Sequence, residues 1–280
     1  MLPDKLAFVD IETTGISLFK DRVIEVGVLR VENGEVVETY NSLINPETNL
    51  APEIELLTGI TQGDLTGAPS FYEIKKDIFK ILEDCLFIAH NVRFDFSFLK
   101  KEVSRFDMDF SPKQLCTVRL SRALYPQERH HNLAEIITRF NLKTKNRHRA
   151  FDDAKAIFEF FNLAKTQFDE NIFLNAVSKI QKRPTIPSKI TQEVLDSVPD
   201  TPGVYIFLGL NKVPLYVGKS INLRTRILSH FSSDHSSTKE LRIASQIETI
   251  EYIETAGELG ALIKESELIK KMEPIYNRKL

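Results

Sequence analysis

The chain has 280 residues, 42% hydrophobic and 27% charged, which is a globular composition long enough for two domains, and its net charge of −2 excludes a globally basic nucleic-acid binder. Its two cysteines, Cys85 and Cys116, lack CxxC spacing, which argues against a disulfide framework or a Cys-rich zinc site and favours free thiols in a reducing cytosol. The sequence has no apolar run of ~18 residues and no secretory signal, so we expect a cytoplasmic protein that does not contact a membrane.

Short strands open the first half of the chain, and helices follow. Strand-forming residues at 6–9 and 23–29 predict two strands, and Asn33-Gly34 predicts a hairpin turn that returns the chain through 36–44. A further buried strand is expected at 86–89. Apolar residues recur at helical spacing over 71–82, 94–106, 133–140 and 150–164. This order predicts an α/β architecture around one mixed sheet.

Composition changes near residue 180. Residues 182–189 contain two prolines and three charges without an apolar period, so they read as a linker. A second unit begins near Ser197, with paired strands at 204–207 and 215–217, a strand at 250–253, and helices at 221–231 and 259–272. We therefore predict one domain over residues 1–165, a linker over 166–197 and a second domain over 198–280.

The two parts differ slightly in charge. Residues 1–182 carry 24 Lys and Arg against 27 Asp and Glu, and residues 183–280 carry 13 against 12. An acidic front part suits a region that gathers carboxylates around metal ions. Local basic clusters would then hold phosphates, and the candidates are Lys143, Lys145, Arg147 and Arg149 in front and Lys219, Arg224, Arg226, Lys239 and Arg242 behind.

Four carboxylates and a histidine stand out in the front part. Asp10 and Glu12 are two residues apart at a strand end, so both project from one face, where like charges are costly unless a cation lies between them. Asp95 begins a helix after a buried strand, and His148 precedes Asp153 by five residues where another helix begins. Each piece alone has an ordinary alternative: a polar strand end, a helix N-terminal charge or a loop histidine.

Taken together and in this order, the three pieces resemble the DEDDh, or DnaQ-like, 3′→5′ exonucleases. The resemblance covers residues 1 to about 165 and implies a ribonuclease H-like mixed-sheet exonuclease domain. It implies that two Mg²⁺ or Mn²⁺ ions are held by four carboxylates, those of Asp10, Glu12, Asp95 and Asp153. It also implies that His148 is the general base, and that the terminal nucleotide lies against Thr13, Thr14 and Gly15.

The implied roles agree with the chemistry of these groups. Carboxylate oxygens are the ligands that Mg²⁺ and Mn²⁺ prefer, and two such ions about 4 Å apart can stabilise the attacking and leaving oxygens. An imidazole that titrates near neutrality can take a proton from water. Gly15 would permit close approach of the backbone to the nucleotide.

A second set of polar residues lies in the last third of the chain. It begins with Gly203-Val204-Tyr205 and Tyr216-Val217-Gly218-Lys219. Tyrosines on adjacent strands are more often packing residues than catalysts, but the polar residues that follow them in the sequence favour a catalytic site. Arg226 and His230, four residues apart, share a helix face, Glu265 interrupts an apolar-periodic helix, and Asn277 follows.

This series resembles the GIY-YIG nucleases, most closely the incision domain of the UvrC and Cho group, over residues 198–280. The resemblance implies a small α/β domain in which Glu265 holds one divalent metal ion and Tyr205 or Tyr216 helps to activate water. Lys219 and Arg226 would contact the scissile phosphate, and Asn277 would complete the site. The sequence departs from the family at Val204 and Val217, which replace isoleucines, and at His230, a base or phosphate ligand where relatives often carry tyrosine.

The two resemblances imply a bifunctional DNA repair nuclease, in which the rear domain nicks a strand and the front domain trims the 3′ end. DNA is the expected partner, together with a repair or replication protein. Two alternatives remain open. The front motif also occurs in RNA-processing exonucleases, since recognition of the 2′-hydroxyl is not encoded in it. The rear domain could instead be a non-catalytic module that docks DNA or a partner protein.

Overall fold

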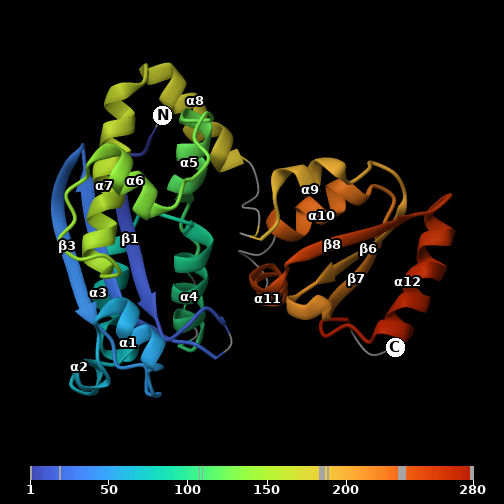
Figure 1. Cartoon of the computed structure of the whole chain (residues 1–280), viewed down its shortest axis with the longest axis horizontal. Coiled ribbons are helices and arrows are strands. Elements are labelled where there is room, and N and C mark those ends of the chain that lie inside the picture. The colour runs from blue at the N-terminus through green and yellow to red at the C-terminus, as the bar shows by residue number, and fades with distance from the viewer. Residues whose placement is uncertain are drawn as a thin grey trace. The chain divides into compact units, whose positions relative to one another are not determined.

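The computed structural model describes residues 2–18, 20–106, 108, 110–182, 187, 189–232 and 238–277. The chain divides into two compact units, Met1–Lys182 and Arg183–Leu280, and each contains its own sheet (Figure 1). Within the described residues, no helix has both the length and the apolar character needed to cross a membrane.

The sheet of the first unit is mixed, as predicted. It contains β1 (Lys5–Thr13), β2 (Val23–Glu32), β3 (Glu35–Leu43), β4 (Leu86–Ala89) and β5 (Gln114–Cys116) in the order β3-β2-β1-β4-β5. β1, β2 and β3 are antiparallel, whereas β4 runs parallel to both β1 and β5. The hairpin between β2 and β3 turns at Asn33 and Gly34, both with positive φ, which confirms the predicted turn.

Helices cover both faces of this sheet (Figure 1). Leu6 and Phe8 of β1 share a core with Ile157 and Phe160 of α7, and on the other face Phe87 of β4 packs edge-on against Phe96 of α4. The helices of this unit are α1 (Pro52–Thr58), α2 (Gln62–Thr66), α3 (Phe71–Leu82), α4 (Val92–Ser104), α5 (Thr117–Leu124), α6 (Leu133–Phe140), α7 (Ala150–Gln167) and α8 (Glu170–Lys182).

The segment predicted as a linker, residues 166–197, contains helices at both ends. α8 places Phe173, Ala176, Val177 and Ile180 in the core of the first unit, at the i, i+3, i+4, i+7 spacing of an amphipathic helix. In the second unit, α9 (Gln192–Ser197) buries Leu195. The structure therefore differs from the linker prediction here, because these apolar stripes have cores to cover. The centre of the predicted linker, residues 183–186 and 188, lies outside the described residues.

The second unit is a three-stranded antiparallel sheet with helices on both faces (Figure 1). The strands β6 (Gly203–Leu208), β7 (Pro214–Ser220) and β8 (Thr249–Glu254) have the order β7-β6-β8. One face, which carries Tyr205 and Phe207, packs against α10 (Leu223–Ser232) and α11 (Thr238–Gln246), and the other packs against α12 (Glu258–Met272). A short 3₁₀ turn, η1 (Leu210–Lys212), joins β6 to β7. This confirms the predicted small α/β fold.

Candidate active sites

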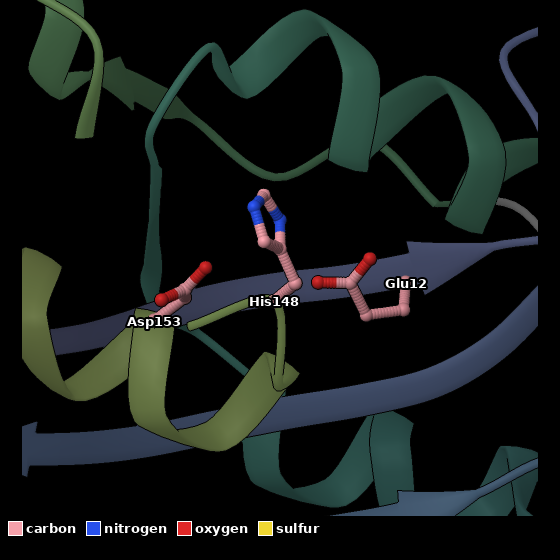
Figure 2. Close-up of side chains that lie close together, drawn as sticks. All are labelled: Glu12, His148 and Asp153. Carbon is pink, nitrogen blue, oxygen red and sulfur yellow. The ribbon is translucent and has the colours of Figure 1, made fainter. Parts of the chain in front are cut away.

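The front constellation assembles where β1 ends beneath the start of α7. Side chains alternate along β1, so Asp10 and Glu12 extend onto the same face as Phe8, the face that α7 covers. His148 immediately precedes α7, and Asp153 lies in its first turn. Figure 2 shows the His148 ring between the carboxylates of Glu12 and Asp153. Ligand atoms of these three residues lie within 4.8 Å of one another.

Asp95 approaches the same place from α4. β4 runs parallel to β1, so the loop that follows β4 starts α4 close to the end of β1. Asn91, in the left-handed conformation at φ 69°, begins the helix. Asp95 is 2% exposed and lies close to the Ile11 backbone of β1 and to the Asp10 carboxylate, with which it interacts electrostatically. The structure thus brings together all five front residues that the sequence singles out.

Crowding and burial make the ionised form of these carboxylates costly. Burial raises the pKa of Asp10 well above its usual value, and the charges of Asp95, Asp153 and Glu12 raise it further. The pKa of Glu12 is raised from 4.5 to about 8, first by burial and then by Asp153. Burial likewise raises the pKa of Asp95 and Asp153. Four acids arranged in this way need positive charge to ionise together.

The donor set fits hard divalent cations. It is built from carboxylate oxygens with one adjacent imidazole, which suits Mg²⁺ or Mn²⁺ better than a thiophilic metal. Asp153 forms an ion pair with the guanidinium of Arg147, which is its only cationic partner among the described residues. The Arg147 charge lowers the pKa of Asp10, Glu12 and Asp153, in opposition to burial.

A buried carboxylate on β2, Glu25, holds the segment that carries His148. Glu25 is 1% exposed and pairs with Arg149 at 2.8 Å. It also accepts the Ala150 backbone N–H at 2.9 Å, one of the unpaired donors at the start of α7. Because Arg149 follows His148 directly, this contact fixes the loop next to the candidate base.

Gly27 allows the start of α7 to lie directly on the sheet. It is paired with Asp10 across the β1–β2 ladder. A Cβ at Gly27 would come within 2.4 Å of the Ala150 carbonyl carbon and of the Phe151 nitrogen. Only glycine therefore permits this approach, which sets the height of Asp153 above β1.

The loop after β1 is held by its own hydrogen bonds. Thr13 donates to the Gly15 carbonyl at 2.6 Å, and Thr14 donates to Asp21 at 3.1 Å. A Cβ at Gly15 would lie 2.6 Å from the Asp21 carboxylate, so a larger residue here would displace the Asp21 side chain. Both threonines are buried, at 7% and 8% exposure. The predicted contact of Thr13, Thr14 and Gly15 with a nucleotide stays a prediction.

In the second unit, Tyr205 and His230 lie together on the face covered by α10 and α11. The Tyr205 hydroxyl is 2.5 Å from His230 Nε2, and His230 Nδ1 is 2.5 Å from a carboxylate oxygen of Glu240. Tyr205 and His230 are almost fully buried. Burial raises the pKa of Tyr205 and Tyr216, and the charge of Arg226 lowers both.

Gly218 explains why the second short motif ends in glycine. It is paired with Tyr205 across the β6–β7 ladder. A Cβ at Gly218 would lie 2.4 Å from the Tyr205 hydroxyl oxygen and 2.9 Å from the Tyr216 ring. Glycine thus leaves space for the two tyrosine rings, whose centroids are 6.1 Å apart.

The other predicted rear residues lie along β7. Glu265 of α12 accepts the Lys219 backbone N–H at 3.1 Å, and the Lys219 ammonium pairs with Glu258 at 3.1 Å. Both polar groups of the Asn277 amide bond the backbone of Val217, at 2.9 and 2.8 Å. Asn277 thus anchors the last described segment to β7, and the catalytic roles predicted for these residues stay predictions.

The basic clusters expected to hold phosphates have several structural partners. Arg149 pairs with Glu25, and Arg147 pairs with Asp153. Arg224 donates to the carbonyls of Asp196 and Val198, whereas Arg226 is exposed near the two tyrosines. Of the arginines in these clusters, we therefore favour Arg226 as a phosphate contact.

Sequence reasoning missed two acidic residues, Glu25 and Glu240. An isolated acid within the apolar run Val23–Leu29 is a detectable signal for Glu25, because a buried charge requires a partner. Glu240 has no comparable signal, since its contact with His230 depends on how α11 packs.

Comparison with known proteins agrees with the two family resemblances, one in each unit. A family model described as "Exonuclease" matches residues 7–161, and one described as "UvrC-like GIY-YIG domain" matches residues 201–278. A Mycobacterium tuberculosis protein with the name "Putative bifunctional exonuclease/endonuclease protein" is 29% identical over 282 residues, which cover 97% of this chain and 44% of that protein.

Two further likenesses concern mainly the first unit. The 3′-5′ exonuclease DinG of Staphylococcus epidermidis is 33% identical over 165 residues, 59% of this chain and 18% of DinG. The chain thus spans less than half the length of either curated relative. The solved structure of Escherichia coli exonuclease I with a dA16 oligonucleotide has the same fold, with a TM-score of 0.57 and 20% identity, over 73% of this chain and 48% of that one.

Proposed function

The chain belongs to the exonuclease family and carries a UvrC-like GIY-YIG domain, and from this premise we propose that it nicks DNA with the second unit and trims 3′ ends with the first. Both parts are nucleases of divalent-metal-dependent types. The observation that carries the proposal is the convergence of three carboxylate-bearing elements, β1, α4 and α7, beside one histidine.

In the first unit, Asp10, Glu12, Asp95 and Asp153 would hold two Mg²⁺ or Mn²⁺ ions. When bound, such ions stabilise the charge on the attacking and leaving oxygens. His148 would accept a proton from the attacking water, and its proximity to Glu12 and Asp153 supports this role. Glu25 keeps the start of α7 in place through Arg149 and the Ala150 N–H.

In the second unit, Glu265 would hold one divalent ion next to the Lys219 backbone. Arg226 supplies a permanent charge with fork geometry for a phosphate that gains negative character. Its exposure and its proximity to Tyr205 and Tyr216 support this role. Lys219 would contact the same phosphate by leaving its ion pair with Glu258, whose side chain is 68% exposed, and pairing with the substrate instead.

The likeness to a protein named for exonuclease and endonuclease activities supports the combination of incision and trimming, and a role in DNA repair fits that combination. Incision creates a free 3′ end, which is the substrate that the front unit would need. DNA, together with a repair or replication protein, is the partner that we propose.

Matched oligonucleotides test the exonuclease part of this proposal. DNA and RNA strands of one sequence, labelled at the 5′ end, are incubated with the full chain in Mg²⁺ or in chelator. We expect a ladder of products on DNA in Mg²⁺, formed by stepwise loss from the 3′ end. Release of a labelled mononucleotide at the first step would contradict the polarity, and faster digestion of RNA would favour the RNA-processing alternative.

Closed circular DNA tests the endonuclease part, because it offers no end to an exonuclease. We expect conversion to the open circle in Mg²⁺ or Mn²⁺ by the full chain, with no conversion in chelator. Persistence of the closed form while oligonucleotides are trimmed would instead favour a second unit that only docks DNA or a protein.

A further inference from the structure

We propose that Glu240 of α11 is a positioning residue of the GIY-YIG site, which orients His230 as the final acceptor of the proton that the attacking water loses. The proton would travel through Tyr216 and Tyr205. This inference rests on the proposed endonuclease function and deepens it.

The hydrogen bonds around His230 determine its tautomer. A carboxylate can only accept, so the contact of Glu240 with Nδ1 requires a hydrogen on Nδ1. In the neutral ring, Nε2 is then an acceptor, and the Tyr205 hydroxyl 2.5 Å away must donate to it. His230 is 3% exposed, so water does not compete for either nitrogen.

The direction of this bond decides how the tyrosines interact. Tyr205 has one hydroxyl hydrogen, which it gives to His230, so its oxygen is left to act only as an acceptor toward the nearby Arg226 and Tyr216. Tyr205 is fully buried, whereas Tyr216 is partly exposed. Tyr216 is therefore the end of the chain that water can reach.

Protons can move along this path without leaving either tyrosine as a phenolate. Water gives a proton to the Tyr216 oxygen, the Tyr216 hydroxyl proton moves to Tyr205, and the Tyr205 proton moves to His230 Nε2. The products are an attacking hydroxide, two neutral tyrosines and an imidazolium beside the Glu240 carboxylate. The hydroxide forms the new P–O bond as the P–O bond to the leaving oxygen breaks. The leaving oxygen takes a proton from solvent water, and His230 returns its proton to solvent through the two tyrosines, which restores the neutral imidazole.

Other charges around the path agree with this direction. α11 also places the Lys239 ammonium 4.5 Å from the centroid of the Tyr216 ring, and Arg226 lies near both tyrosines. These positive charges favour electron density on the tyrosine oxygens during transfer. Burial raises the pKa of Tyr205, which favours relay through the neutral hydroxyl over storage of a negative charge.

Nitrogen NMR of the full chain, labelled at histidine, tests the arrangement without reference to activity. Long-range proton–nitrogen spectra distinguish the two neutral tautomers. We expect His230 to carry its hydrogen on Nδ1 in the wild type and in Glu240→Gln, whose amide oxygen still accepts. Glu240→Ala should mix the tautomers. Glu251→Gln, an exposed acid on β8, is the matched control and should leave the spectrum unchanged.

Conversion of closed circular DNA tests the consequence. We expect Glu240→Ala to slow nicking on the order of 10²-fold, the usual contribution of a positioned proton acceptor, and Glu240→Gln to slow it through loss of charge although the tautomer is kept. Trimming of oligonucleotides by the first unit should be unchanged in both.

The outcomes separate the relay from the proposed function. A wild-type His230 with its hydrogen on Nε2 overturns the relay, as does full nicking by folded Glu240→Ala. Absence of nicking in the wild type contradicts the endonuclease function. In that case the Nδ1 hydrogen, present in the wild type and disturbed in Glu240→Ala, still supports the positioning of His230 by Glu240.

Discussion

At the scale of single residues, both sites depend on side chains that position others. Glu25 binds no substrate in our account, yet it fixes the loop beside His148 through Arg149 and the Ala150 N–H. Support of this kind is worth roughly 10- to 100-fold in metal affinity or activity when it is removed from a metal site.

We therefore expect Glu25→Gln to lower trimming at least about tenfold while nicking is unchanged. The amide retains the size of the side chain but loses the charge that Arg149 requires. Glu35→Gln, at the exposed start of β3, is the control and should behave as wild type. Initial rates on a labelled oligonucleotide provide the measurement, and equal rates for the two variants would contradict a positioning role for Glu25.

A second prediction concerns Gly218. The Cβ of Gly218→Ala would meet the Tyr205 hydroxyl at 2.4 Å and displace a buried ring, so nicking should fall below detection while trimming persists. Gly257→Ala is the control, because no atom lies within 4 Å of its added Cβ and its φ of 171° is ordinary extended backbone. Circular dichroism confirms that both variants are folded. Normal nicking by Gly218→Ala would show that the Tyr205 position is not needed.

Many of the site residues can be predicted from the sequence, and the others are defined only by tertiary contacts. Asp10 and Glu12 can be predicted as metal ligands because burying two ionised acids at the end of an apolar strand costs free energy unless a cation is bound. The contact of Glu240 with His230 joins two helices, and the register of that packing is not encoded in any short motif.

At the scale of elements, the first site depends on how closely α7 approaches β2. Gly27→Ala should push the start of α7 off the sheet, because its Cβ would lie 2.4 Å from backbone atoms that cannot move independently. We expect loss of trimming and a destabilisation of about 1–3 kcal/mol, measured by denaturant unfolding. Gly67→Ala, with open space around its Cβ, is the control. Wild-type trimming by Gly27→Ala would contradict the proposed seating of α7.

The elements themselves follow from periodicity to a large extent. Strands β1 to β4 and the helices α3, α4, α6 and α7 lie where the strand and helix patterns predict them, whereas the three-residue strand β5 has no counterpart among the predicted strands because it is too short to show a periodic pattern. Helix α8 lies within the segment predicted as a linker, because the prolines that follow it favour a linker, although Phe173, Ala176, Val177 and Ile180 have helical spacing.

At the scale of the whole molecule, the carboxylate cluster links stability to pH. The pKa of Glu12 is about 8 in the folded chain against 4.5 for the free group, and the pKa values of Asp10, Asp95 and Asp153 are also raised. The folded state therefore holds more protons than the unfolded state across this window, so the free energy of unfolding falls as pH rises.

In chelator, the Tm for unfolding of the first unit should thus decrease by several degrees between pH 6.5 and about 8. Below 6.5, His90 contributes with the opposite sign, because burial lowers its pKa to about 4. Saturating Mg²⁺ should flatten the decrease by stabilising the ionised acids, and Glu12→Gln should reduce it. Scanning calorimetry provides the measurement, and a Tm in chelator that rises over this window would contradict the account.

Sequence and structure agree most fully on the division of the chain into two nuclease parts. Each motif set lies within a single unit, because the residues between Asp10 and Asp153 fold around one sheet and those between Tyr205 and Asn277 around another.

Two substitutions test that division most directly. Asp153→Asn, Glu265→Gln and the double variant are each assayed on closed circular DNA and on an end-labelled oligonucleotide in Mg²⁺. We predict that Asp153→Asn abolishes trimming and retains nicking, that Glu265→Gln does the reverse, and that the double variant has neither activity. Loss of both activities from either single substitution, in a protein that remains folded, would contradict the existence of two separate sites.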